Sequence, residues 1–308
     1  MAFSSPLSSS LLCFHSSPCP KSRPRTKTLA LPSLLAAADV TAGTSIDSTT
    51  LAVLGGGSVA ALAAVLSLAD PEKRRQLQAE EVGGGDKEVV REYFNNSGFQ
   101  RWKKIYGETD DVNRVQLDIR LGHSKTVENV LKMLKDEGPL QGITVCDAGC
   151  GIGSLSIPLA KEGAIVYASD ISATMVAEAE EQAKSEDLPT VPKFEVRDLE
   201  SLDGKYDTVV CLDVLIHYPQ SKADEMIAHL ASLAKTRLIL SFAPKTFYYD
   251  WLKRVGELFP GPSKATRAYL HAERDVERAL QKAGWKIRNR GLITTQFYFA
   301  RLVEAIPA

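Results

Sequence analysis

The sequence predicts an α/β fold, with a mostly parallel sheet that carries helices on both faces. Apolar runs typical of buried strands alternate with amphipathic helical segments through most of the chain after residue 124, and strands joined by helical crossovers pair in parallel. A glycine-rich loop follows the first strand, where open sheets of this kind bind ligands. The last two predicted strands lie only a few residues apart and should pair antiparallel. We therefore expect a seven-stranded sheet with an antiparallel last strand, preceded by a helical arm.

The individual elements follow from the period of the apolar residues. Apolar residues recur at helical spacing over 86–107, and Asn95, Asn96 and Gly98 divide this segment into two helices. Ser172 is a suitable cap for a later helix. Further helices are predicted at 124–138, 154–161, 173–185, 221–235, 245–258 and 273–283. Strands are predicted at 143–148, 164–169, 193–199, 206–215, 237–244, 285–291 and 294–305.

Residues 1–45 have the composition of a transit peptide. No Asp or Glu precedes Asp39, and the segment is rich in serine with a basic cluster at 21–27. Such segments direct proteins to organelles and are removed, and the start Met-Ala favours the chloroplast. We therefore leave this segment out of the fold.

Residues 46–85 form an apolar segment and a linker. No charged residue lies between Asp47 and Asp70, a stretch long enough to cross a bilayer as a helix. Its alanines and glycines make the hydrophobic driving force weak, so we expect weak membrane association. A cleaved second targeting signal and a flexible spacer are the alternatives. The basic residues at 73–75 could contact anionic lipid.

The rest of the chain is predicted to comprise the arm at 86–123 and a catalytic domain at 124–308. The net charge is −1, and no basic stripe with interleaved aromatic residues is present, so nucleic acid is excluded as a partner. The five cysteines form no Cys-x-x-Cys pair and no cluster with histidine. We therefore expect a reducing compartment and no protein-bound metal.

The glycine loop points to a particular nucleoside ligand. Gly149, Gly151 and Gly153 follow the spacing G-x-G-x-G, whereas the dinucleotide fingerprint is G-x-G-x-x-G. Asp147, two residues before the first glycine, would repel a pyrophosphate and attract a sulfonium or an ammonium group. Asp170 ends the next strand, where a carboxylate can accept the ribose hydroxyls. These features favour S-adenosylmethionine over NAD.

Residues after the second and third strands complete this predicted donor site. Asp198 ends the third strand and could accept the adenine amino group, and Met175 could lie against the adenine ring. Ile171 and Leu199, next to the two strand-end acids, are included in the same site.

Four segments of the chain carry a resemblance to a known family. "VCDAGCGIGSLSIPLAKEGAIVYASDISATMV" resembles the donor-binding half of a class I methyltransferase. "VREYFNNSGFQRWKKIYG", "VNRVQLDIRLGHSKTVENVL" and "CLDVLIHYP" resemble the magnesium protoporphyrin IX O-methyltransferases of chlorophyll synthesis, over roughly residues 86–305. The resemblance implies a Rossmann-like fold, S-adenosylmethionine as methyl donor, and methyl transfer to one propionate of magnesium protoporphyrin IX. The magnesium would belong to the substrate.

This reaction sets modest chemical demands. A propionate titrates near the pKa of Glu, about 4.3, and is already ionised at neutral pH. The enzyme therefore needs no strong general base. It must align the carboxylate with the methyl carbon and exclude water from both.

His217 and Tyr106 are the predicted catalytic residues. His217 follows the fourth strand at its carboxyl end, where an imidazole could hold one propionate oxygen in line. A histidine satisfied by backbone groups is the alternative. The resemblance implies a catalytic tyrosine in the arm, with Tyr106 as first choice and Tyr93 as second. We expect Phe94, Phe99 and Trp102 to pack the arm onto the body.

Other predictions depend on the resemblance or leave alternatives. His123 and His271 could approach the magnesium axially, although their spacing does not support it. Another hydrophobic acceptor, such as a quinone, is the alternative substrate. A plastid enzyme of this kind would act on the stromal side of the envelope and thylakoid membranes and could receive its substrate from magnesium chelatase.

Overall fold

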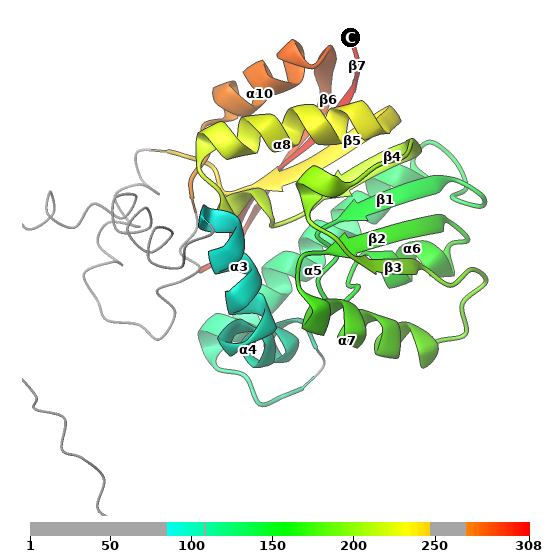
Figure 1. Ribbon diagram of the computed structural model, residues 1–308, viewed down its shortest axis with the longest axis vertical. Coiled ribbons are helices and arrows are strands. Elements are labelled where there is room, and N and C mark those ends of the chain that lie inside the picture. Colours follow the sequence, from blue (N-terminus) through cyan, green and yellow to red (C-terminus); the bar gives the residue numbers. More distant parts are fainter. Residues whose placement is uncertain (1–84, 108, 247–268) are drawn as a thin grey trace, which may run out of the picture. The chain divides into compact units, whose positions relative to one another are not determined.

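The computed structural model describes residues 85–107, 109–246 and 269–308 of the chain (Figure 1). The predictions for residues 1–45, for most of 46–85 and for most of the helix at 245–258 lie outside these residues.

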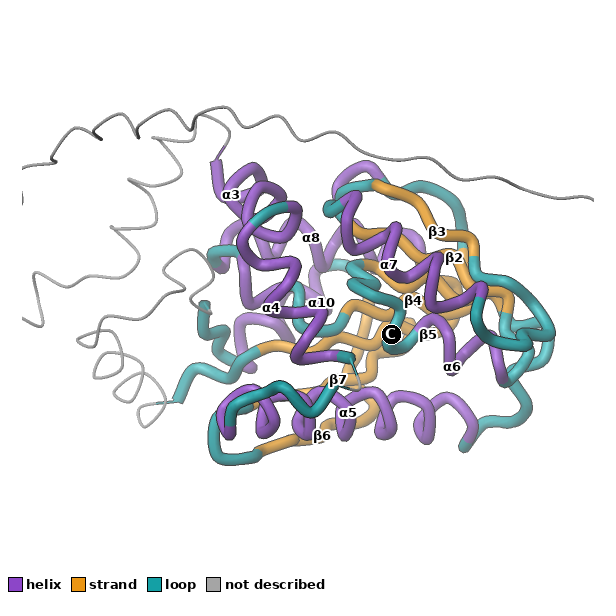
Figure 2. Tube along the Cα trace, turned by 90° about the horizontal axis from the view of Figure 1, so that it is seen from below, coloured by secondary structure: helices purple, strands orange, loops and turns teal. Residues whose placement is uncertain are grey.

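The arm consists of two short helices followed by a long one. Helices α3 (Gly85–Asn95) and α4 (Ser97–Tyr106) meet at the predicted break. Helix α5 (Arg114–Lys135) begins before the predicted position 124, because Asn113 and Gln116 form a capping box at its start. The predicted boundary between arm and catalytic domain at 123/124 therefore falls inside α5. Figure 2 shows α3 and α4 beside α5 and α7, which they contact.

The seven-stranded sheet has the predicted character. Its order is β3-β2-β1-β4-β5-β7-β6, in which β7 is antiparallel to both of its neighbours and the first five strands are parallel. The strands are β1 (Thr144–Ala148), β2 (Ile165–Asp170), β3 (Lys193–Val196), β4 (Tyr206–Cys211), β5 (Ala234–Phe242), β6 (Trp285–Thr294) and β7 (Phe299–Pro307).

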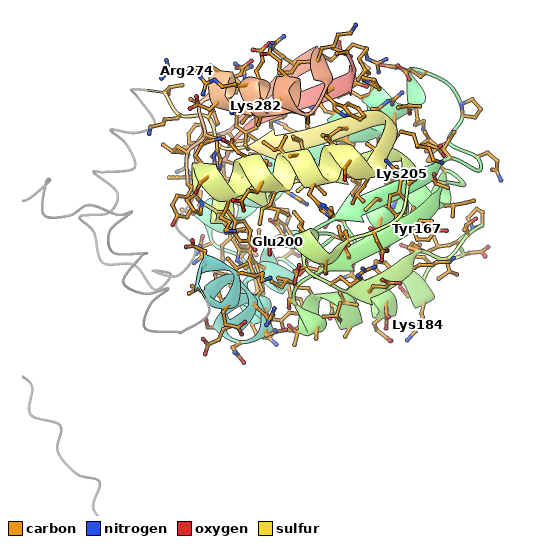
Figure 3. All side chains as sticks on the ribbon, turned by 45° about the horizontal axis from the view of Figure 1, so that its top comes forward. Tyr167, Lys184, Glu200, Lys205, Arg274 and Lys282 are labelled. Carbon is orange, nitrogen blue, oxygen red and sulfur yellow. The ribbon has the colours of Figure 1, made fainter. Side chains whose placement is uncertain are left out.

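Helices cover both faces of the sheet with apolar side chains. The remaining helices are α6 (Ser156–Lys161), α7 (Ala173–Lys184), α8 (Gln220–Leu233) and α10 (Glu273–Lys282). One core layer joins the sheet to α8 and α10, and a second joins it to α5 and α6 (Figure 1). Charged side chains such as Lys184 and Lys282 point outward from the helices in Figure 3. The carboxyl ends of the parallel strands lie next to the arm.

Strand β4 ends earlier than predicted. The sequence pattern extends the strand to residue 215, but β4 ends at Cys211. Asp213 has φ 57°, and its backbone N–H donates to the Ser241 hydroxyl at 2.7 Å. This turn redirects the chain into the short helix η2 (Leu215–His217).

Within the described ranges, no helix is both long and apolar enough to cross a membrane, and no group of three or more His, Cys, Asp or Glu could hold a metal ion.

Candidate active site

A cavity of about 90 Å³ lies at the carboxyl ends of the parallel strands. Loops after β1, β2 and β3 form one side, and the arm together with η2 (Leu215–His217), which follows β4, forms the other. Its lining residues are Val90, Phe94, Trp102, Tyr106, His123, Gly149, Cys150, Gly151, Ser154, Asp170, Ile171, Met175, Leu199, Leu212, Asp213, Val214, Ile216, His217 and Tyr218. We call its two sides the donor wall (Gly149, Gly151, Asp170, Ile171, Met175 and Leu199) and the arm wall (Phe94, Trp102, Tyr106 and His217).

The glycine loop brings the backbone close to the cavity. Gly149 has φ 88°, a conformation that residues with a Cβ rarely adopt. A Cβ at this position would lie 2.2 Å from Cγ2 of Val214. Gly149 therefore lets the loop after β1 pass directly beside the loop after β4.

Asp170 is held in place by backbone groups. Its Oδ2 accepts from the Gly151 N–H at 3.0 Å and its Oδ1 accepts from the Ser172 N–H at 2.8 Å. Burial raises the pKa of the Asp170 carboxyl, although the backbone N–H groups of Ser172, Gly151 and Ile171 act against this. A half-buried carboxylate that lines the cavity at the end of β2 suits the two hydroxyls of a ribose.

Apolar side chains complete the donor wall. Met175 is 2 % exposed, and its backbone N–H donates to the Ser172 hydroxyl, which caps α7. Ile171 and Leu199 line the cavity from the ends of β2 and β3. Together they form the flat apolar surface that an adenine ring requires.

Three of the predicted donor residues lie away from the cavity wall. Asp147 is buried beneath α6, where it accepts from the Ser156 hydroxyl at 2.6 Å, and burial raises its pKa to about 6. Its carboxylate therefore supports the glycine loop from below and does not line the cavity. Gly153 begins the turn into α6 and packs near Ile157.

Asp198 is the third of these residues. Its side chain accepts from the Ser201 N–H at 2.9 Å and pairs with Lys87 of α3 at 3.3 Å. Lys87 also pairs with Glu200 at 3.1 Å, and Figure 3 shows Glu200 beside the arm. In this structure Asp198 therefore joins the arm to the loop after β3.

Aromatic rings form the arm wall. Phe94 makes an edge contact with His217 at 5.3 Å between ring centroids and lies 6.3 Å from Trp102. Trp102 lies 5.2 Å from Tyr106, which stacks on His123 at 4.2 Å. The two predicted catalytic residues, Tyr106 and His217, therefore line one cavity and are connected through two intervening rings.

Tyr106 and Tyr93 have different environments. Tyr106 lines the cavity, and burial together with the charge of Asp213 raises its pKa well above the usual range, so the hydroxyl keeps its proton. Tyr93 packs against Gly98, and its hydroxyl accepts from the Trp102 indole N–H at 3.1 Å. Tyr93 is not among the lining residues. The geometry thus favours Tyr106.

Phe94 packs against the core, as predicted for the arm aromatics, and both Phe94 and Trp102 also line the cavity. Phe99 does not line it; its ring lies 5.9 Å from the Lys103 ammonium. Helical spacing identified the apolar face of the arm, but it could not show that this face lies over the strand ends.

Sequence reasoning also missed Asp213. This residue lines the cavity and accepts hydrogen bonds from His123 at 2.9 Å and from the hydroxyls of Ser241 and Tyr298. A single acid inside the apolar run "CLDVLI" was the available signal.

His123 and His271, the other two candidate histidines, have different environments. His271 is 1 % exposed, and its ring nitrogens lie 2.7 Å from the Gln220 side-chain oxygen and 2.9 Å from the Leu215 carbonyl oxygen. It is therefore a core residue. His123 lines the cavity and also a larger neighbouring cavity of about 880 Å³, which lies between the arm and helices α6 and α7.

Known proteins match most of this chain. A family model described as Magnesium-protoporphyrin IX methyltransferase C-terminus matches residues 211–307, and a methyltransferase domain model matches 145–237. The chain is 78 % identical over 273 residues to the chloroplastic magnesium protoporphyrin IX methyltransferase of Arabidopsis thaliana, covering 88 % of this chain and 87 % of that one. The chain belongs to the magnesium protoporphyrin IX methyltransferase family.

A relative from Synechocystis matches over a shorter length. The magnesium-protoporphyrin O-methyltransferase of Synechocystis is 56 % identical over 222 residues, which cover 72 % of this chain and 96 % of the relative. A crystal structure of the Synechocystis magnesium protoporphyrin IX methyltransferase with bound SAH (S-adenosylhomocysteine) aligns with a TM-score of 0.66 and 53 % identity, covering 72 % of this chain and all of that one. The chain is thus a class I methyltransferase whose donor is S-adenosylmethionine.

The donor wall fits this donor. Gly149 leaves room for close approach, Asp170 presents a half-buried carboxylate, and Met175 supplies an apolar surface. The Arabidopsis relative is named a chloroplastic protein, which agrees with the location predicted from residues 1–45.

Proposed function

We propose that the chain transfers a methyl group from S-adenosylmethionine to a propionate carboxylate of magnesium protoporphyrin IX and forms its monomethyl ester. The observation that carries this proposal is a single cavity with a donor wall at the strand ends and an aromatic arm wall opposite. The 78 % identity to the Arabidopsis enzyme supports the choice of substrate. The arm wall argues against a quinone, because it lies in the arm, which resembles the porphyrin enzymes specifically.

The donor supplies a methyl group on a positively charged sulfur. The donor wall holds the nucleoside through Asp170 and Met175, which leaves the methyl group to point toward the loop after β4. Because a carboxylate and a sulfonium neutralise each other during transfer, a dry site lowers the barrier. The partly buried rings of Phe94 and Trp102 line this side of the cavity and reduce the access of water to it.

His217 and Tyr106 are the residues that we assign to the acceptor. Both line the cavity, and neither needs to remove a proton, since the propionate is ionised. The protonated Tyr106 hydroxyl can donate to one carboxylate oxygen, and the His217 imidazole can hold the same group in line. Alignment of two reactants alone can supply about 7 kcal/mol of the barrier.

Methyl transfer is the direct test. The purified chain, supplied with labelled S-adenosylmethionine, should transfer the label to magnesium protoporphyrin IX, shift its Soret band on binding, and give a product that alkaline hydrolysis cleaves as an ester. Metal-free protoporphyrin and a soluble quinone serve as acceptor controls. Transfer to the quinone without transfer to the porphyrin would refute the assignment.

Membrane association and a chelatase partner belong to the same proposal. We infer that residues 46–85 seat the chain on the stromal side of the envelope and thylakoid membranes, because this segment is uncharged over most of its length. The full chain should float with vesicles that contain anionic lipid, and Leu62→Asp with Leu66→Asp should abolish flotation. Unchanged flotation of this variant would refute the role of the segment.

A direct transfer from magnesium chelatase would protect a photoreactive substrate. Immobilised chelatase should therefore retain the chain at physiological salt. Failure of the chain to bind at any salt concentration would contradict this partner.

A further inference from the structure

Asp213 holds a backbone conformation that calls for an explanation. Among residues 85–107, 109–246 and 269–308, it is the one non-glycine residue with a positive φ, at 57°. Aspartate tolerates this region better than most residues, but the conformation is still uncommon and gathers at functional sites. The turn at Asp213 directs its side chain beneath the arm wall.

Three elements supply hydrogen bonds to the Asp213 carboxylate. Ser241 of β5 donates to Oδ1 at 2.9 Å, and the Tyr298 hydroxyl from the β6–β7 turn lies 3.0 and 2.9 Å from the two carboxylate oxygens. Nδ1 of His123 on α5 lies 2.9 Å from Oδ2. Gly122 permits this arrangement, because a Cβ there would lie 2.3 Å from the Tyr298 ring.

The carboxylate is therefore buried and ionised. Burial alone would raise the pKa of Asp213, but the hydrogen bond and charge of His123, with the hydroxyls of Tyr298 and Ser241, lower it below the ordinary value. An ionised Asp213 accepts the proton on Nδ1 of His123 and so fixes the orientation of the imidazole ring.

The fixed imidazole supports Tyr106. The two rings stack with centroids 4.2 Å apart and planes inclined by 29°. Tyr106 also contacts Trp102 of the arm, with 5.2 Å between the ring centroids. The position of the Tyr106 hydroxyl therefore depends on one ring from the arm and on one ring anchored by Asp213.

We propose that Asp213 and His123 are positioning residues, which hold the Tyr106 hydroxyl at the point where the acceptor carboxylate meets the methyl group. The proposal rests on the proposed function. The rival explanation is that His123, which itself lines the cavity, contacts the substrate directly. The two explanations differ in how the effects of substitutions combine.

A double-mutant cycle separates them. His123→Ala should lower kcat about 10-fold in the native enzyme, but change it less than about twofold in a Tyr106→Phe background, since no hydroxyl remains to be positioned. His123→Phe, which keeps a ring against Tyr106 and removes the bond to Asp213, should lose less than His123→Ala. Asp213→Asn should repeat the pattern of His123→Ala.

The controls address folding and histidine content. His229 of α8 has a ring nitrogen 2.9 Å from the Leu202 carbonyl oxygen and lies outside both cavities, so His229→Ala should leave kcat unchanged. Calorimetric affinity for S-adenosylhomocysteine shows that each variant is folded.

Two results would overturn the proposal: losses that multiply in the His123→Ala and Tyr106→Phe double variant, or an unchanged kcat in folded His123→Ala. Absence of methyl transfer by the native chain would refute the proposed function instead.

Discussion

The donor wall and the arm wall face each other across one cavity but are built in different ways. The donor wall is set by backbone: strand ends, a glycine loop at φ 88° and N–H groups that hold Asp170. The arm wall is set by ring contacts that join Phe94, Trp102 and Tyr106 to His217. The first wall is rigid by construction, whereas the second depends on the packing of two short helices.

The size of the cavity bears on ligand entry. Small-molecule sites usually enclose about 300–1,000 Å³, while the cavity between these walls measures about 90 Å³. Tyr106, His123 and Ser154 also line the neighbouring cavity of about 880 Å³, so the larger space beside this site lies on that side of the arm.

Gly149→Ala tests the rigidity of the donor wall and should have the largest effect. The new Cβ would lie 2.2 Å from Cγ2 of Val214, and the alanine would have to adopt φ 88°. The free energy of unfolding should therefore fall by about 3 kcal/mol. Donor affinity should fall as well. Urea unfolding and calorimetry measure the two effects.

Gly151→Ala is the matched control, because its φ is 54° and a Cβ there meets nothing within 4 Å. It should cost about 1 kcal/mol in unfolding free energy. Equal losses in the two variants would show that the close approach at Gly149 does not matter.

The same difference explains what the sequence could predict. The mostly parallel sheet with its antiparallel last strand follows from the alternation of strand and helix patterns, and the placement of Asp170, Met175 and His217 at the cavity follows from strand ends that converge at one edge. The lining roles of Phe94 and Trp102 do not follow, because helical spacing is the same for packing against the body and for covering a cavity. The turn of the Asp147 carboxylate toward Ser156 could not be predicted either, because the spacing of the loop does not show which way a side chain beneath it points.

The early end of β4 has a similar cause. The apolar run through residue 215 reads as a continuous strand, and only the tertiary bonds of Asp213 to Ser241 and His123 stop it. These partners are distant in sequence, so local patterns could not reveal them.

Asp147, beneath the glycine loop, and Asp213, which lines the cavity, should titrate with opposite effects on stability. The pKa of Asp147, about 6 in the folded chain, lies above the unfolded value, so the native state loses stability as the pH rises from about 4 to 6. Asp147→Asn should therefore stabilise the chain by up to about 3 kcal/mol above pH 6 and have no such effect near pH 4.

Asp213→Asn should behave in the opposite sense. Its folded pKa is lowered, so the carboxylate contributes stability above pH 3.8 that is lost as the pH falls further. The variant should be destabilised at neutral pH, with a difference that shrinks in acid. Chemical unfolding as a function of pH measures both variants, and a parallel profile for the two would contradict these assignments.

Lys87→Ala probes the attachment of the arm and should have a small effect. Lys87 of α3 bridges Asp198 and Glu200, but its side chain is 35 % exposed, so the loss of stability should be below about 1 kcal/mol. The Michaelis constant for the donor should change slightly, since the arm covers the donor. Lys222→Ala, which removes a pair to Glu200 from α8, is the control. Identical kinetics in the two variants would show that this pairing does not hold the arm.

The most direct test of the account compares Asp170→Ala with His217→Ala in donor affinity and in kcat. Asp170→Ala should raise the donor dissociation constant about 10- to 100-fold with little change of kcat at saturating donor, because it removes hydrogen bonds to the ribose. His217→Ala should lower kcat about 100-fold and leave donor affinity nearly unchanged. A parallel loss of donor affinity in His217→Ala would contradict the assignment of the two walls to donor and acceptor.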